Sequence, residues 1–145
     1  MESERDHELE RIKNRKVAAI FRERREREKR AQVPRGVVHV GSCDAFARIF
    51  SSFPEVPVFV YAWASWCHPC KQAGPLYEKV AASFPGQAIF LKLETDSTAC
   101  AEFSKRYDVM AVPSFLALKN WRVVGRLTGL PRPGELLAFV RQHLS

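Results

Sequence analysis

The stretch VPVFVYAW, residues 56–63, most constrains the fold, because its residues are apolar without alternation. A strand that covers one side of a core alternates apolar and polar residues, whereas a continuous apolar run is typical of a strand buried on both faces. The run is far shorter than the ~20 apolar residues of a membrane-spanning helix. It therefore predicts the central strand of a sheet that is covered on both sides.

Further strands and helices are expected around this run, and they alternate along the chain. Alternation of this kind predicts a layered α/β domain with parallel strands. The last two strands flank KNWR, residues 119–122, which is typical of a hairpin turn and makes that pair antiparallel. The expected strands are residues 37–40, 56–63, 88–93, 114–118 and 123–127, and the expected helices are residues 42–50, 67–84 with a kink at Pro75, about 96–107, and about 133 to the C-terminal end.

The first 35 residues differ in composition from the rest of the chain. They contain twelve Lys or Arg and eight Asp or Glu side chains, a net charge of +4 within the +7 of the whole chain. The signs alternate, which indicates a solvated helix with i,i+3 and i,i+4 pairs and does not favour nucleic-acid binding. We expect a charged helical extension over residues 1–35 and one domain over residues 36–145. A narrow apolar stripe leaves open whether the extension docks on a core or on a protein partner: Leu9, Ile12, Val17, Ile20 and Phe21.

The overall composition favours a globular protein of the cell interior. Apolar residues make up 46% of the chain, more than disordered chains contain. The N-terminus lacks the apolar segment of a secretory signal and is richer in acids than a mitochondrial transit peptide. We expect a cytoplasmic protein without a membrane span, and a nuclear or mitochondrial location stays open.

Two cysteines three residues apart, within WASWCHPCKQAGP (residues 63–75), are the main chemical signal. Cys67 is expected at the N-terminus of a helix, where backbone N–H groups and the helix dipole stabilise a thiolate and lower the pKa of the thiol. Cys70 follows one turn later on the same face. From there it can attack a mixed disulfide held on Cys67. The spacing favours a nucleophile and a resolving thiol.

Other interpretations of the pair stay open at this point. A zinc site usually needs two such pairs, and Cys43 and Cys100 do not form a second one, so no metal is expected. Haem attachment would need histidine directly after Cys70, where Lys71 stands. An inert pair of core cysteines is the remaining alternative. Cys43 itself is expected to be a small core residue.

The motif WCHPC between an apolar strand and a helix, followed by AVPSF at residues 111–115, resembles the thioredoxin family, and the resemblance extends over about residues 36–145. It implies a thioredoxin fold, a central mixed sheet of about five strands with helices on both faces, here preceded by the helical extension. It also implies a protein-disulfide oxidoreductase with no bound cofactor beyond a redox-active disulfide, Cys67–Cys70. Its partners would be protein disulfide substrates and a thioredoxin-reductase-type or other dithiol donor.

The resemblance also assigns a substrate groove. Pro113 would be a cis-proline that faces the cysteine pair, and the backbone of Val112 would bond an extended substrate segment. Trp66, Gly129 and Leu130 would complete a shallow apolar rim. Cys100, outside this groove, falls where some thioredoxins carry a regulatory cysteine, and a half-buried helix position explains it equally well.

Tyr61 departs from the family pattern, because thioredoxins usually carry a buried acid there that moves the proton of the resolving cysteine. A tyrosine, with a reference pKa of about 10, does not do this readily near neutral pH. Lys92 on the neighbouring strand is expected to point toward the same region, without its usual partner. Trp63 is expected to pack beneath the site, with Asp96 as its hydrogen-bond partner.

His68 is the second departure, at a position where thioredoxins usually have glycine. A partly protonated imidazole beside Cys67 would favour the thiolate and make the disulfide more oxidising. With its neighbour Pro69 it is counted among the residues that modulate the pair, and a solvent-facing side chain without a role is the alternative. One histidine shifts the potential only part of the way between about −270 and about −120 mV, so we expect a reductant before an isomerase or oxidant.

A different class of function also fits the layout. A charged helix ahead of a thioredoxin-like domain resembles phosducin-like adaptor proteins, which work through their surfaces. The replaced acid at position 61 slightly favours such a binding module, and the intact pair Cys67 and Cys70 opposes it.

Overall fold

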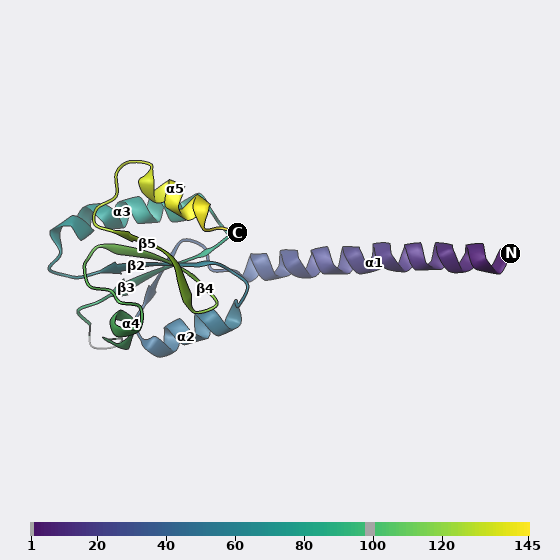
Figure 1. The fold of residues 1–145 in the computed structure, drawn as a ribbon, viewed down its shortest axis with the longest axis horizontal. Coiled ribbons are helices and arrows are strands. Elements are labelled where there is room, and N and C mark those ends of the chain that lie inside the picture. Colours follow the sequence, from purple (N-terminus) through teal and green to yellow (C-terminus); the bar gives the residue numbers. More distant parts are fainter. Residues whose placement is uncertain (1, 98–100) are drawn as a thin grey trace. The chain divides into compact units, whose positions relative to one another are not determined.

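The computed structural model describes residues 2–97 and 101–145 and contains a five-stranded mixed sheet (Figure 1). The spatial order is β1-β3-β2-β4-β5, with β1, β3 and β2 parallel, and with β2–β4 and β4–β5 antiparallel. The predicted mixed sheet with one hairpin is therefore confirmed. The strands are β1 (Val37–Val40), β2 (Val58–Trp63), β3 (Ile89–Glu94), β4 (Ser114–Lys119) and β5 (Arg122–Thr128).

Strand β2 occupies the centre of the sheet, as its apolar sequence predicts. It pairs with β3 on one edge and with β4 on the other. Phe59 and Tyr61 enter the core on one face, and Val58 and Val60 enter the core on the other, so both faces are buried. The strand begins at Val58 rather than at residue 56 because Pro57 has no N–H for the ladder, although its carbonyl accepts a hydrogen bond from β3.

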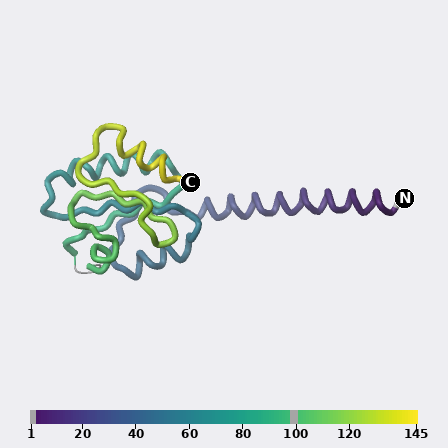
Figure 2. Tube along the Cα trace, in the orientation of Figure 1, coloured from purple at the N-terminus to yellow at the C-terminus, as the bar shows by residue number. Residues whose placement is uncertain are grey.

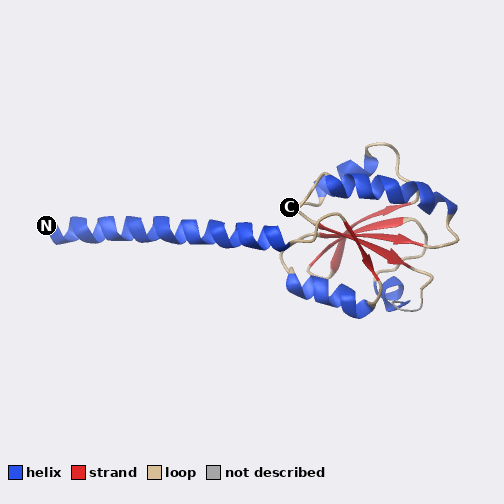
Figure 3. Cartoon of the chain, turned by 180° about the vertical axis from the view of Figure 1, so that it is seen from behind, coloured by secondary structure: helices blue, strands red, loops and turns tan. Residues whose placement is uncertain are grey.

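Helices cover both faces of this sheet, as expected (Figures 1 and 3). Helices α3 (His68–Ala82) and α5 (Glu135–Gln142) lie on one face, and α2 (Cys43–Ser52) and α4 (Ala101–Arg106) lie on the other. Helix α5 packs beside α3 although the two are distant in sequence (Figure 2). The sheet thus has one core beneath α3 and α5 and a second core beneath α2 and α4.

Local sequence explains where several helices begin. Ser42 caps α2, because its hydroxyl accepts a hydrogen bond at 3.1 Å from the N–H three residues later. Pro75 lies inside α3, and the helix continues through it. The last helix begins at Glu135, close to Pro133 as predicted, after Gly134 takes a left-handed conformation with φ of +83°, which glycine adopts readily.

The N-terminal helix α1 (Glu2–Gln32) forms a unit of its own, and a second compact unit begins at Val33. The expected boundary lay after residue 35. Val33 belongs to the second unit because its side chain is buried in the core beneath α2 and α4.

Along α1, ion pairs occur at the predicted spacings. Arg11 and Glu8 form an i,i+3 pair, and Arg24 and Glu28 form an i,i+4 pair, each at 3.9 Å and exposed. Among the described residues, no helix combines the length and apolar content needed to cross a membrane. The apolar stripe of α1 is exposed at every position: Leu9, Ile12, Val17, Ile20 and Phe21.

Candidate active site

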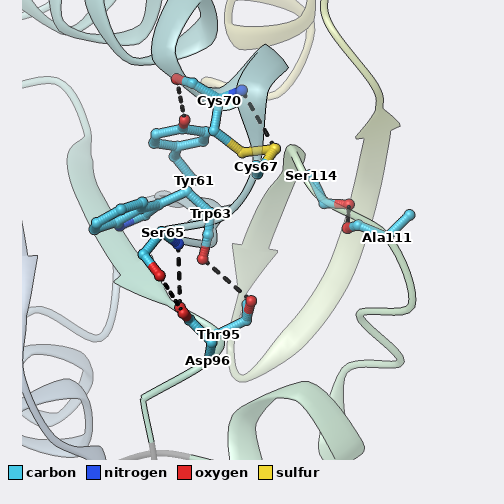
Figure 4. The surroundings of a disulfide bond; sticks show 9 residues. All are labelled: Tyr61, Trp63, Ser65, Cys67, Cys70, Thr95, Asp96, Ala111 and Ser114. Carbon is cyan, nitrogen blue, oxygen red and sulfur yellow. Dashed lines mark hydrogen bonds between the residues drawn. A yellow bond between two sulfur atoms is a disulfide. The ribbon is translucent and has the colours of Figure 1, made fainter.

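The two cysteines of WCHPC lie where β2 leads into α3, and their sulfur atoms form a disulfide (Figure 4). Their Cα atoms are 5.3 Å apart. Cys67 is the N-cap of α3, and its Sγ accepts a hydrogen bond at 3.3 Å from the backbone N–H of Cys70. The same N–H and the positive end of the helix dipole favour a negative charge on the Cys67 sulfur. This geometry suits a redox dithiol.

The zinc interpretation finds no support in the described part of the chain. No group of three or more His, Cys, Asp or Glu side chains there could hold a metal ion. Cys43 lies at the start of α2, partly buried, and packs against the core beneath that helix. The predicted position of Cys100 lies outside the described residues.

The loop before β4 lies beside the disulfide (Figure 4). The peptide bond between Val112 and Pro113 is cis. The hydroxyl of Ser114 donates a hydrogen bond to the Ala111 carbonyl at 2.5 Å, and the N–H of Gly129 donates one to the Pro113 carbonyl at 2.8 Å. Val112 packs against the core cluster that contains both cysteines. The fold thus places Val112 against the cluster that contains the cysteine pair.

Exposed apolar side chains adjoin this centre, either directly in sequence or next to Gly129, which is hydrogen-bonded to Pro113. Trp66, directly before the first cysteine, is 73% exposed, and Leu130, after the end of β5, is 43% exposed. Met110, directly before the cis-proline loop, is 91% exposed and was not singled out from the sequence. The sequence signal that could have identified Met110 is its position as a large apolar residue directly before AVPSF. Exposed apolar side chains of this kind mark binding surfaces when they gather at one place.

Tyr61 reaches the cysteine pair from β2. Its side chain is 1% exposed, and its hydroxyl donates a hydrogen bond to the carbonyl of Cys70 at 2.8 Å (Figure 4). Its ring stacks on Phe115 and packs against Tyr77, with ring centres 5.1 and 5.3 Å away. Burial raises the pKa of Tyr61 to about 12, so the hydroxyl stays protonated near neutral pH. The sequence did not predict the bond to Cys70.

Lys92 lies on the face of the sheet that carries Tyr61. The two residues are register partners in the β2–β3 ladder. The Nζ atom of Lys92 lies 4.7 Å from the centre of the Trp63 ring, a cation–π contact. Trp63 itself packs against the core cluster that contains the cysteines.

The predicted hydrogen bond between Asp96 and Trp63 is wrong. Asp96 instead accepts hydrogen bonds from the N–H of Ser65 at 3.3 Å and from its hydroxyl at 2.5 Å (Figure 4). The reason is the pairing beyond β3: Thr95 binds the Trp63 carbonyl, which places the next residue against Ser65. The hydrogen bond from the Ser65 side chain lowers the pKa of Asp96. The buried Trp63 Nε1 has no hydrogen-bond partner among the residues that the structure describes.

His68 and Pro69 form the first turn of α3 between the two cysteines. Both side chains are exposed. Proline is well suited to this turn, because the first N–H groups of a helix have no intrahelical partner. His68 is therefore accessible from solvent.

A mixed sheet with a CxxC disulfide at a helix N-terminus, beside a cis-proline loop, defines a protein of dithiol–disulfide exchange. The family model described as Thioredoxin matches residues 37–142, most of the chain. The chain belongs to the thioredoxin family and is a thiol–disulfide oxidoreductase.

Individual relatives agree with this assignment. The thioredoxin of Haemophilus influenzae is 28% identical over 108 residues, which cover 74% of this chain and 97% of that protein. The crystal structure of the long form of spinach chloroplast thioredoxin f is 33% identical and superposes with a TM-score of 0.69 over 82% of this chain and 94% of that one. A thioredoxin f2, solved in complex with ferredoxin:thioredoxin reductase, is 27% identical with a TM-score of 0.67, over 76% of this chain and 94% of that one.

Proposed function

We propose that this protein reduces disulfides in other proteins, with Cys67 as the nucleophile and Cys70 as the resolving thiol. The Cys67 thiolate attacks one sulfur of the substrate disulfide, forms a mixed disulfide and releases the other substrate sulfur as a thiolate. The Cys70 thiolate then attacks Sγ of Cys67, which closes the Cys67–Cys70 disulfide and releases the second substrate sulfur. Two electrons pass to the substrate, and its two thiolates take up the two protons that the cysteine thiols lost.

The observation that carries this proposal is the disulfide at the N-terminus of α3. Only the Cys67 sulfur accepts a hydrogen bond from the backbone of that turn. A thiolate at this position is stabilised and therefore forms at lower pH, which makes Cys67 the better attacking group.

The substrate is proposed to bind as an extended segment along the cis-proline loop. The backbone of Val112, next to the cis peptide bond of Pro113, would supply strand-like hydrogen bonds to this segment. Trp66, Gly129 and Leu130 form the apolar rim, and the exposed Met110 extends it.

Four further residues are proposed to tune the pair. His68 places an imidazole directly after Cys67 in the sequence, and Pro69 stiffens the turn between the cysteines. Lys92 keeps a positive charge over Trp63, on the face of the sheet that faces the cysteines. Tyr61 contacts the backbone of Cys70 directly.

A dithiol protein or a thioredoxin-reductase-type enzyme is proposed to return the disulfide to the dithiol. The complex of thioredoxin f2 with ferredoxin:thioredoxin reductase supports a donor of this kind. We place the reaction in the cytoplasm, where a reducing pool keeps such a donor supplied. A protein partner for α1 stays a prediction, for which the exposed apolar stripe is the argument.

The adaptor alternative is not favoured. An adaptor that works through its surface has no need of a closed CxxC disulfide at a helix N-terminus, and this chain keeps that arrangement.

Insulin reduction in the presence of dithiothreitol tests the proposal. The wild-type chain should accelerate precipitation of the insulin B chain, and Cys67→Ser should remove the acceleration completely. Ser65→Ala is a matched control, because it changes a neighbouring residue without removing a sulfur. Equal rates for the wild type and Cys67→Ser would contradict the proposed activity.

A further inference from the structure

We propose that the Tyr61 hydroxyl is a positioning group for the cysteine pair: it holds the turn that carries Cys70, so that the Cys70 N–H stays directed at the Cys67 sulfur. The inference rests on the proposed role of Cys67 as nucleophile. The Tyr61 hydroxyl donates its hydrogen bond to the Cys70 carbonyl, so Tyr61 acts through the backbone of Cys70.

The hydroxyl of Tyr61 has a fixed direction. The ring is 1% exposed in the middle of β2, with Phe115 stacked at 5.1 Å and an interplanar angle of 15°. Tyr77 packs against it at 5.3 Å. A ring confined in this way keeps one orientation. Its hydroxyl therefore stays in one position and can hold a hydrogen-bond partner there.

Cys70, the partner of this hydroxyl, forms hydrogen bonds through both its carbonyl and its N–H. The carbonyl of Cys70 accepts the Tyr61 hydroxyl at 2.8 Å, and the N–H of Cys70 donates to the Cys67 Sγ at 3.3 Å. Both groups are buried, since Cys70 is 5% exposed and Cys67 3%. One residue thus links the sheet to the sulfur that is expected to carry the negative charge.

The turn of α3 that holds Cys70 depends on this link more than an ordinary helical turn would. Pro75 has no N–H to donate to the carbonyl of Lys71, the residue directly after Cys70. The first turns of α3 therefore have one backbone hydrogen bond fewer than a regular helix. A bond from the rigid sheet replaces part of that restraint.

The same geometry favours a positioning role for Tyr61 over a role in proton transfer. The hydroxyl already donates its proton to a carbonyl, which has no proton to return. Tyr61 therefore acts on the pair by holding it in place, and the expected effect of removing the hydroxyl is on the reactivity of Cys67.

Tyr61→Phe tests the inference, with Tyr77→Phe as its matched control. Tyr77 is equally buried in the same cluster, but its hydroxyl donates to the carbonyls of Phe59 and Leu91 and not to the cysteine turn. Both changes remove a buried hydroxyl and should lower stability, because each removes hydrogen bonding from that hydroxyl to buried backbone carbonyl oxygen. Only the first should alter the cysteine pair.

The readout is the rate at which Cys67 in the reduced full-length chain reacts with iodoacetamide as a function of pH, with the labelled cysteine identified by mass spectrometry. Tyr61→Phe should slow the reaction at about pH 6 roughly threefold or more and move the profile to higher pH, because a hydrogen bond to a charged sulfur is weakened. Tyr77→Phe should leave the profile of the wild type unchanged.

An unchanged profile in Tyr61→Phe, with both variants destabilised to the same extent, would overturn the inference and leave Tyr61 as a core residue. If Tyr61→Phe is too unstable at first, the three profiles are recorded in sucrose, which favours the folded state. The alkylation rate does not depend on turnover. If the wild type fails to reduce insulin, that result would therefore refute the proposed function and would not bear on the role of Tyr61.

Discussion

Trp66 gives the sharpest test of the apolar rim, because its indole is 73% exposed directly before Cys67. A tryptophan side chain presents up to about 250 Å². If a bound substrate covers half of the exposed part, roughly 90 Å² leaves water, which corresponds to about 2 kcal/mol. Trp66→Ala is therefore expected to lower kcat/KM for a protein disulfide about 30-fold.

The assay compares two substrates in the wild type and in Trp66→Ala. Insulin is large enough to cover the indole, whereas a small aromatic disulfide such as dithionitrobenzoate reaches the sulfur with little contact to the rim. The insulin rate should fall and the small-molecule rate should stay within about twofold. The free energy of unfolding should change by less than about 0.5 kcal/mol, because the side chain is exposed. An equal loss on both substrates, or no loss on insulin, would refute the reasoning.

Three further substitutions test contacts elsewhere in the fold. Ser42→Ala should lower the free energy of unfolding by about 1 kcal/mol in a urea titration, since the cap of α2 is lost, and an unchanged midpoint would contradict the cap. Since the hydrogen bond from Ser65 lowers the pKa of Asp96, the carboxylate contributes stability above its unfolded-state pKa, and this contribution is lost as pH falls through the lower folded-state pKa. Asp96→Asn should therefore flatten the acidic part of the plot of Tm against pH, and an unchanged slope would show that the bond contributes nothing. Gly125→Ala should lower the free energy of unfolding by about 1 kcal/mol, because the new Cβ would meet the ring of His143, which must move. Thermal melts that coincide with those of the wild type would show that the ring moves freely.

The central strand and the redox pair could be predicted because each depends on a short local pattern. The apolar run at residues 56–63 determines burial on both faces wherever the neighbouring elements lie. Cys67 follows a strand and precedes a helix, which is sufficient to place it at a helix N-terminus. Neither position needed a distant residue. The choice of dithiol chemistry over a metal site also used AVPSF at residues 111–115 and the lack of a second cysteine pair.

Contacts between distant segments could not be predicted in the same way. The bond from Tyr61 to the Cys70 carbonyl depends on the position of α3 relative to β2. No local sequence pattern predicts that position. Asp96 was expected at Trp63, but the ladder beyond β3 continues to Thr95 and places the carboxylate against Ser65. A shift of one residue along the chain was enough to change the partner.

The assignment of Cys67 as the nucleophile and Cys70 as the resolving thiol is tested most directly by covalent capture of a substrate. The reduced Cys70→Ser chain is mixed with a peptide that contains one disulfide, and the product is analysed by intact mass and by peptide mapping, with reduced Cys67→Ser as the comparison. The proposal predicts a stable one-to-one adduct through Cys67 in Cys70→Ser and no comparable adduct in Cys67→Ser. An adduct that forms through Cys70 in Cys67→Ser, while Cys70→Ser stays unmodified, would contradict the assignment of Cys67 as the nucleophile.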